Sequence, residues 1–282
     1  FGRYSYAPSS TFARNPTNVA NSTANDDRTG TQTATAGLTW IATPRIVNDL
    51  RMNYSRASAV GQSIVDDFGG AAPIPLSSLL PAGYNYNNAF FTMTISNTLG
   101  YRTRFDVGTN VANLQQQYNV IDSVSIAMGT HQIKAGMDFR RLTPSFEPRS
   151  LFQSYVVNSL QTFLKGFITT ATISTGQPAN PTYNNIGAYI QDTWKVTPRV
   201  TLTYGLRWDC EPAVTLPKAV AVDQITDIPT MSFRPSSVTL YGTNYLVFAL
   251  RIGIAYQLIP SERWGTVVRS AWGPYYDLMN SE

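Results

Sequence analysis

Few side chains in this sequence have the types and spacing that catalysis requires. Asp66 and Asp67 are adjacent carboxylates, which could serve acid–base chemistry or bind a cation. Neighbouring residues of an extended chain face opposite ways, so a solvated loop is the favoured interpretation. The segment 25–28, Asn-Asp-Asp-Arg, could place carboxylates around a calcium ion, but a solvated polar turn explains it more simply.

Motifs for nucleophilic, metal or phosphate chemistry are missing from the sequence. His131 is the single histidine, which excludes a histidine-based metal cluster, and Cys210 is the single cysteine, which excludes an intramolecular disulfide. There is no Gly-x-Ser-x-Gly elbow, no phosphate-cradling glycine loop and no Cys-x-x-Cys pair. We therefore expect no catalytic residues, no metal, no cofactor and no enzymatic activity.

Charged residues with an alternating spacing form a second group of candidates. Lys134, Asp138 and Arg140 share one parity of the stretch 131–141, and Arg207 and Asp209 share one parity of the stretch 200–209. Side chains of one parity lie on one side of an extended strand. Two interpretations remain open for these five residues: simple solvation, or the lining of a water-filled lumen.

Aromatic residues form a third group. Tyr84, Tyr86, Phe90 and Phe91 follow the glycine- and proline-rich stretch 69–83. They could contact a ligand by stacking, and they could equally pack the loop against itself.

The charged candidates lie on segments with a period of two. Leu202, Tyr204, Leu206 and Trp208 alternate with polar residues, which predicts a strand with one apolar and one polar face. The motif Trp-x-x-Thr-Pro-Arg occurs at 40–45 and again at 194–199, and its proline predicts a hairpin turn. In all, about eight strands are expected, paired as four hairpins, at residues 31–41, 46–56, 118–128, 131–140, 187–197, 200–209, 244–257 and 265–272.

Long stretches without alternation separate these hairpins. We expect residues 1–30 to form an exposed loop and residues 57–107, 142–183 and 210–241 to form long extracellular loops within a single partial barrel domain, 1–282. A short helix ending at a glycine is predicted at residues 158–166. Short turns at one end of the strands and very long loops at the other are typical of outer-membrane barrels, and unusual in compact soluble domains.

Composition agrees with an all-β membrane protein. Aromatic residues make up 12% of the chain and charged residues 13%, against roughly 25% charged residues in ordinary soluble domains. The net charge of +4 comes from scattered arginines, so nucleic-acid binding is not expected. No apolar run reaches the length of about 18 residues of a membrane-spanning helix. No signal peptide is visible at the N-terminus, so we expect a fragment or a processed product.

Several segments resemble a known family. The stretch from Gly187 to Arg207 resembles the barrel of TonB-dependent outer-membrane receptors, and the closest group looks like the Oar-like transporters. The stretches 131–141, 250–256 and 268–277 are similar to other barrel strands of that group, and Phe163-Leu-Lys-Gly166 looks like a shortened form of its Phe-Leu-Leu-Gly motif.

The resemblance implies a barrel of about 22 strands with a plugged lumen, of which roughly a third is present here. It implies an importer in the outer membrane of a Gram-negative bacterium, which takes up a bulky or scarce small molecule or peptide and engages the TonB protein through a plug absent from these residues. A structural or adhesive surface protein and a passive porin are the alternatives. Outer-membrane lipid is the expected surrounding, and the isolated chain is expected to self-associate through open strand edges.

Overall fold

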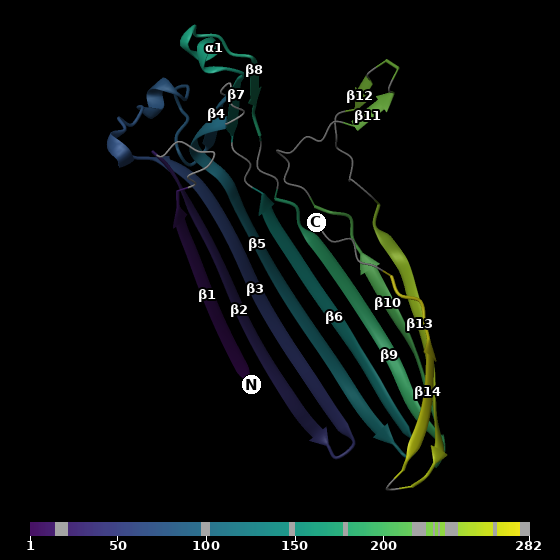
Figure 1. The fold of residues 1–282 in the computed structure, drawn as a ribbon. Helices are drawn as coiled ribbons and strands as arrows, with labels where there is room; N and C mark the ends of the chain where they lie inside the picture. Colours follow the sequence, from purple (N-terminus) through teal and green to yellow (C-terminus); the bar gives the residue numbers. More distant parts are fainter. Residues whose placement is uncertain are drawn as a thin grey trace.

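The computed structural model describes residues 1–14, 22–96, 102–146, 150–176, 180–215, 224–227, 229–230, 232–234, 242–261 and 264–276. Most of the described chain belongs to one twelve-stranded sheet, whose long strands lie side by side in the order β1-β2-β3-β5-β6-β9-β10-β13-β14 (Figure 1). Their bounds are β1 Gly2–Ala13, β2 Thr23–Thr43, β3 Ile46–Val65, β5 Arg102–Met128, β6 His131–Phe146, β9 Tyr183–Thr197, β10 Val200–Glu211, β13 Asn244–Ile259 and β14 Thr266–Trp272. All pairs along this path are antiparallel, and all eight predicted strands are confirmed.

Within the hairpins, short turns join one strand to the next. These turns lie at one end of the sheet, which we call the turn end (Figure 1). The repeated Thr-Pro-Arg motif forms the same turn twice. Thr43 Oγ1 accepts a hydrogen bond from the Arg45 N–H at 3.2 Å, and Thr197 Oγ1 accepts one from the Arg199 N–H at 3.3 Å. Between β5 and β6 the turn places Gly129 at φ +59°, a conformation that glycine adopts without strain.

The strand registers place all the alternating apolar residues on one side of the sheet, the apolar face. Leu206, for example, lies between Ile190 of β9 and Leu250 of β13. The face comprises Leu38, Leu50, Met52, Tyr54, Tyr118, Val120, Ile126, Ile133, Met137, Phe139, Ile186, Ile190, Leu202, Leu206, Phe248, Leu250, Ile252 and Ile254. Met137 is 57% exposed and Leu250 52%, so no part of the described chain covers this face.

The apolar face is limited to a band next to the turn end. In β3 the band runs from Ile46 to Tyr54, in β5 from Tyr118 to Met128, and in β9 from Ile186 to Trp194, so that each strand contributes about nine to eleven residues. This is the length with which a tilted strand crosses a bilayer. Beyond the band the same parity becomes polar, at residues 56, 116, 141 and 184, which are Arg, Gln, Arg and Asn.

Strand β1 and the start of β2 correct the expectation of an exposed loop over residues 1–30. Gly2–Ala13 pairs with the part of β2 from Asn25 to Ala36, and among residues 1–30 only 15–21 lie outside the described ranges. Beyond the apolar band polar residues occupy both parities, as at residues 25–33 of β2, so the alternation disappears. The backbone ladder nevertheless continues, because pairing requires only N–H and C=O groups.

The expected long loops also contain more regular structure than the sequence indicated. Within 57–107 lie the end of β3, the 3₁₀ turns η1 (Phe68–Gly70) and η2 (Leu76–Ser78), β4 (Ala89–Ser96) and the start of β5. Within 142–183 lie the end of β6, β7 (Leu151–Val157), α1 (Leu160–Leu164) and β8 (Thr170–Ser174). The region 210–241 contains β11 (Gln224–Asp227) and β12 (Ser232–Arg234), and most of its remainder lies outside the described residues.

The predicted short helix is confirmed as α1. Ser159 is its N-cap, with a side chain that accepts from the Thr162 N–H at 3.1 Å, and Gly166 follows the helix at φ +74°. Within the described residues no helix is long and apolar enough to cross a membrane.

The elements β4, β7 and β8 form a cap at the opposite end of the sheet, the loop end (Figure 1). β4 pairs with the first residues of β5 and, in parallel, with β7. The cap holds a buried cluster of Leu80, Ala89, Phe91, Val107 and Leu151. The described chain therefore buries its hydrophobic core at the loop end and leaves the apolar face of the long sheet uncovered.

Gly108 is where β5 bends from the long sheet into the cap. Its φ is +106°, and a Cβ atom there would lie 2.0 Å from the Ala89 carbonyl oxygen. Residues before Gly108 pair with β4, and residues after it pair with β3 and β6. A glycine is required at this position by both the dihedral angle and the close approach of β4.

Candidate functional site: a charged network on the polar face

The parity opposite the apolar face forms the polar face of the same strands. It carries the predicted Lys134, Asp138, Arg140, Arg207 and Asp209, together with Asn53, Asn119, Thr193, Thr201, Thr203 and Arg251. The registers bring β6, β9 and β10 next to one another, so residues about 70 positions apart in sequence become neighbours. All five predicted residues therefore share one surface.

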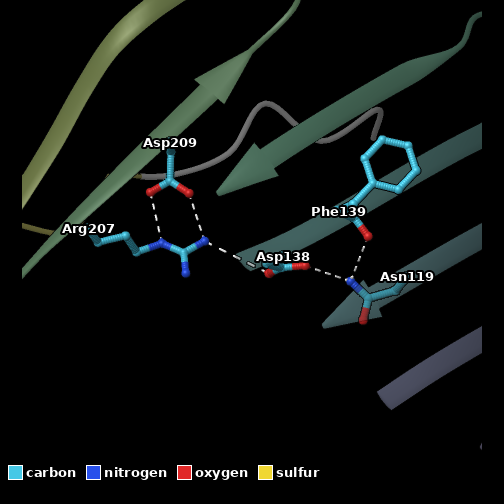
Figure 2. Close-up of polar contacts among 5 residues, drawn as sticks. All are labelled: Asn119, Asp138, Phe139, Arg207 and Asp209. Carbon is cyan, nitrogen blue, oxygen red and sulfur yellow. Dashed lines mark hydrogen bonds and ion pairs between the residues drawn. The ribbon is translucent and has the colours of Figure 1, made fainter. Parts of the chain in front are cut away.

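Three of the five form a charged network, which Figure 2 shows. Arg207 binds Asp209 with two hydrogen bonds, from Nε to Oδ2 at 2.9 Å and from Nη2 to Oδ1 at 2.7 Å. The same Nη2 lies 3.9 Å from Asp138 Oδ2. On the far side, Asn119 Nδ2 donates to Asp138 Oδ1 at 2.9 Å and to the Phe139 carbonyl oxygen at 3.3 Å.

Gly187 provides the space for this network. It lies on β9 directly between Asp209 of β10 and Asp138 of β6. A Cβ atom there would lie 2.6 Å from Arg207 Nη2 and 2.7 Å from Asp209 Oδ1. The absent side chain lets the guanidinium extend over β9 toward Asp138, so three strands are linked by side chains as well as by backbone.

Lys134 and Arg140 lie on either side of the network along β6. Lys134 is exposed near the turn end, and Arg140 is half-buried, with an Nε that has no hydrogen-bond partner among the described residues. The network carries two carboxylates and one guanidinium. Together with the cations of Lys134 and Arg140 on either side, it gives the polar face charges of both signs in one row.

The loop aromatics are part of the cap's core. Phe90 is 7% exposed and Phe91 4%, and Tyr84 and Tyr86 pack against the buried cluster. Packing of the loop against itself, one of the two interpretations left open, describes Phe91, Tyr84 and Tyr86 in this structure, whereas Phe90 also lines a cavity. Contact of these aromatic residues with a ligand stays a prediction. Phe91 is buried because Leu80, Val107 and Leu151 pack around it, and β4 is brought to these residues by its pairing with β5 and β7, which the local sequence does not indicate.

Two carboxylates lie on the apolar face, where none was predicted. Asp192 Oδ2 is 2.7 Å from His131 Nδ1 and accepts from the Tyr204 hydroxyl at 2.9 Å, while Asp122 Oδ1 accepts from Asn48 Nδ2 at 2.7 Å. His131 begins β6, and its ring stacks on the Trp194 ring with the two centroids 5.2 Å apart. Each carboxylate is hydrogen-bonded, which lowers the cost of placing it on an apolar surface.

Other polar-face residues were missed because no local signal marks them. Asn119 stands in a polar run, and its role follows from the β5–β6 register. Arg251 stands alone among apolar residues of β13. Its guanidinium lies 5.1 Å from the centre of the Tyr275 ring, a cation–π contact. In the described residues no group of three or more His, Cys, Asp or Glu side chains is placed to hold a metal ion.

The sequence matches the family described as outer membrane beta barrel domain over residues 1–282. The chain therefore belongs to this family of outer-membrane β-barrels, and its location is the Gram-negative outer membrane. Comparison with curated proteins gives no significant match.

The solved structures that match this chain include the ferric-catecholate import receptor Fiu from Escherichia coli K12, in two forms. The open form has 17% sequence identity and a TM-score of 0.45 over 88% of this chain and 36% of the receptor. The closed form has 15% identity and a TM-score of 0.43 over 85% of this chain and 32% of the receptor. The chain thus spans about a third of the length of these receptors.

Proposed function

We propose that this chain forms part of the wall of an outer-membrane importer. Its apolar face contacts lipid and its polar face lines the passage. The observation that carries the proposal is the band of about nine to eleven residues, apolar on one parity and polar on the other, which ends at the same level in adjacent strands. With a rise of about 3.4 Å per residue and a tilt of about 45°, nine residues span roughly 22 Å, close to the height of an outer-membrane barrel's apolar band.

In this arrangement the turn end faces the periplasm and the loop end with its cap faces outward, since outer-membrane barrels have short periplasmic turns and long outer loops. The charged network lies on the passage side. Its side chains are held by hydrogen bonds on both sides, so they provide a fixed pattern of charge rather than mobile counterions. A plug or a passing substrate would meet this pattern.

The finer assignment is a TonB-dependent, Oar-like importer with a substrate that is bulky or scarce. It is supported by the resemblance of the segment 187–207 and by the paired occurrence of its Thr-Pro-Arg turn. Energy from the inner membrane would move a plug, and the substrate would then pass along the polar face. The alternatives are a passive porin and a surface protein without transport.

One labelling experiment separates these three functions. Cys210 is the single cysteine, so a Cys210→Ala variant provides a background without thiols. Thr203→Cys introduces a thiol on the polar face, and Leu202→Cys introduces one on the apolar face at the adjacent position. Intact cells are treated with a membrane-impermeant maleimide, with and without an uncoupler that collapses the inner-membrane gradient.

An importer predicts labelling at position 203 that falls when the gradient is collapsed, and no labelling at position 202. A passive porin predicts labelling at 203 that the uncoupler does not change. A surface protein without a lumen predicts equal labelling at both positions. Either of the last two results would rule out energy-coupled import.

A further inference from the structure

A cavity of about 340 Å³ lies where the polar face meets the cap. β2 and β3 contribute Asn25, Asp27 and Gln62, and β5 contributes Arg104, Asp106 and Asn110. The cavity exists because β5 bends at Gly108, which carries the first residues of β5 away from β3 and toward β4. Its size falls in the range of small-molecule sites.

The cavity combines donors and acceptors in similar number. Arg104 Nε lies 2.7 Å from Asp106 Oδ2, and the other oxygen, Oδ1, has no hydrogen-bond partner within the described chain although Asp106 is only 2% exposed. Oδ1 itself is buried beneath the cavity lining, so Asp106 contributes negative charge to the cavity rather than a contact atom. Ser63 Oγ donates to Asn25 Oδ1 at 3.0 Å, which fixes the amide and leaves its nitrogen as a donor.

Two aromatic rings form the apolar wall of the cavity. Phe90 of β4 and Phe152 of β7 lie with their centroids 6.3 Å apart and their planes within 9° of parallel. Both line the cavity. A ligand there meets a small apolar surface on one side and polar groups on the others.

This combination selects the chemistry of the ligand. An ammonium group only donates and a phosphate only accepts, whereas a hydroxyl group does both and matches a mixed set of carboxylate, amide and guanidinium groups. Arg104 is already paired with Asp106, and Asp27 adds a second carboxylate, so an anionic ligand is disfavoured. We propose that the cavity binds a neutral saccharide, with its C–H surface toward Phe90 and Phe152 and its hydroxyls toward Asn25, Asp27 and Asn110.

The proposal is independent of energy-coupled transport, and binding to the purified protein tests it. The protein is prepared in a detergent without a sugar head group, and isothermal titration calorimetry is performed with a set of neutral mono- and disaccharides. A lysine-containing dipeptide and inorganic phosphate are titrated as alternative ligands, one cationic and one anionic. We expect at least one saccharide to bind, and the dipeptide and phosphate not to bind.

Asp27→Ala and Asn110→Ala each remove one polar group of the cavity wall, and each is expected to weaken saccharide binding about ten-fold. Asp49→Ala is the matched control, because Asp49 lies in β3 on the same face of the sheet as Asp27 but near the turn end, and it should leave binding unchanged. Circular dichroism verifies that each variant is folded. Absence of binding by the whole saccharide set, binding of the dipeptide or phosphate instead, or equal binding by wild type and both cavity variants would each overturn the proposal.

Discussion

The guanidinium of Arg207 lies over Gly187, so closely that a Cβ atom at the glycine would be 2.6 Å from Nη2. This contact allows one arginine on β10 to bind Asp209 on its own strand and to reach toward Asp138 on β6. Arg207 and Asp209 therefore occupy the space that a side chain at position 187 would need.

The first prediction tests this arrangement. Gly187→Ala should push Arg207 off its partners and leave two neighbouring carboxylates uncompensated, at a cost of about 1–3 kcal/mol in the free energy of unfolding. Gly253→Ala is the matched control on the polar face of β13, because the nearest atom to its added Cβ is 3.6 Å away. Guanidinium-chloride unfolding in phospholipid vesicles measures both. Equal midpoints for the two variants would show that the network tolerates the side chain.

The second prediction concerns the apolar band. Leu206 lies in its middle part, between Ile190 and Leu250. Leu206→Arg should cost about 2–4 kcal/mol in vesicles, because it places a cation in hydrocarbon. Thr203→Arg, on the polar face of the same strand, should cost close to nothing. If the two substitutions cost the same, the apolar face does not contact lipid.

The third prediction concerns the bend in β5. Gly108→Ala meets both a φ of +106° and the Ala89 carbonyl oxygen at 2.0 Å, so we expect the cap to separate from the long sheet. Gly83→Ala has a comparable φ of +92° but no atom within 4 Å, and it should cost only about 1 kcal/mol of backbone strain. Limited proteolysis of the cap compares them. Similar cleavage rates would mean that the close approach of β4 is unimportant.

The fourth prediction is a pH dependence at the loop end. Arg14 donates to Asp66 through both terminal nitrogens, with the Nη1–Oδ1 bond at 2.9 Å, and this hydrogen bonding lowers the pKa of Asp66 below its ordinary value. A carboxyl group whose pKa is lowered by folding stabilises the fold above its unfolded-state pKa. That contribution is lost as the pH falls below about 4 and through the folded-state pKa.

We therefore expect the link between the end of β1 and the segment after β3 to weaken under acid. Proteolysis near residue 66, with an acid-stable protease, should accelerate between about pH 4 and pH 2 in the wild type. Asp66→Asn should be cleaved at a rate that does not change over this range. A wild-type rate that is flat with pH would contradict the role of the ion pair.

The fifth prediction concerns the two edges of the sheet. In the described chain, β1 and β14 each pair with one neighbour only, and their residues are exposed. Unpaired strand edges associate readily with other strands. The purified chain in detergent should therefore form oligomers in size-exclusion chromatography with light scattering, and a monodisperse monomer would contradict this.

The sequence by itself determined the pairing partners of its hairpins, their short turns and the identity of both faces. Period-two alternation is a local property, and residues 202–208 show it without reference to any other strand. It also determined α1, because capping is local. The alternation did not predict the parts of the strands that lie beyond the apolar band. There both faces of a strand are polar, and the backbone pairing continues without a sequence pattern.

Only the tertiary structure decided which residues meet across strands. Arg207 and Asp138 are 69 positions apart, and their contact depends on the registers of β6, β9 and β10 together. In the same way, the burial of Phe91 and the cavity beside Asp106 depend on β4 and β7 lying side by side, which no local pattern indicates. The physical reason is that alternation determines the side of a strand on which a residue lies, whereas contact requires the positions of its neighbours.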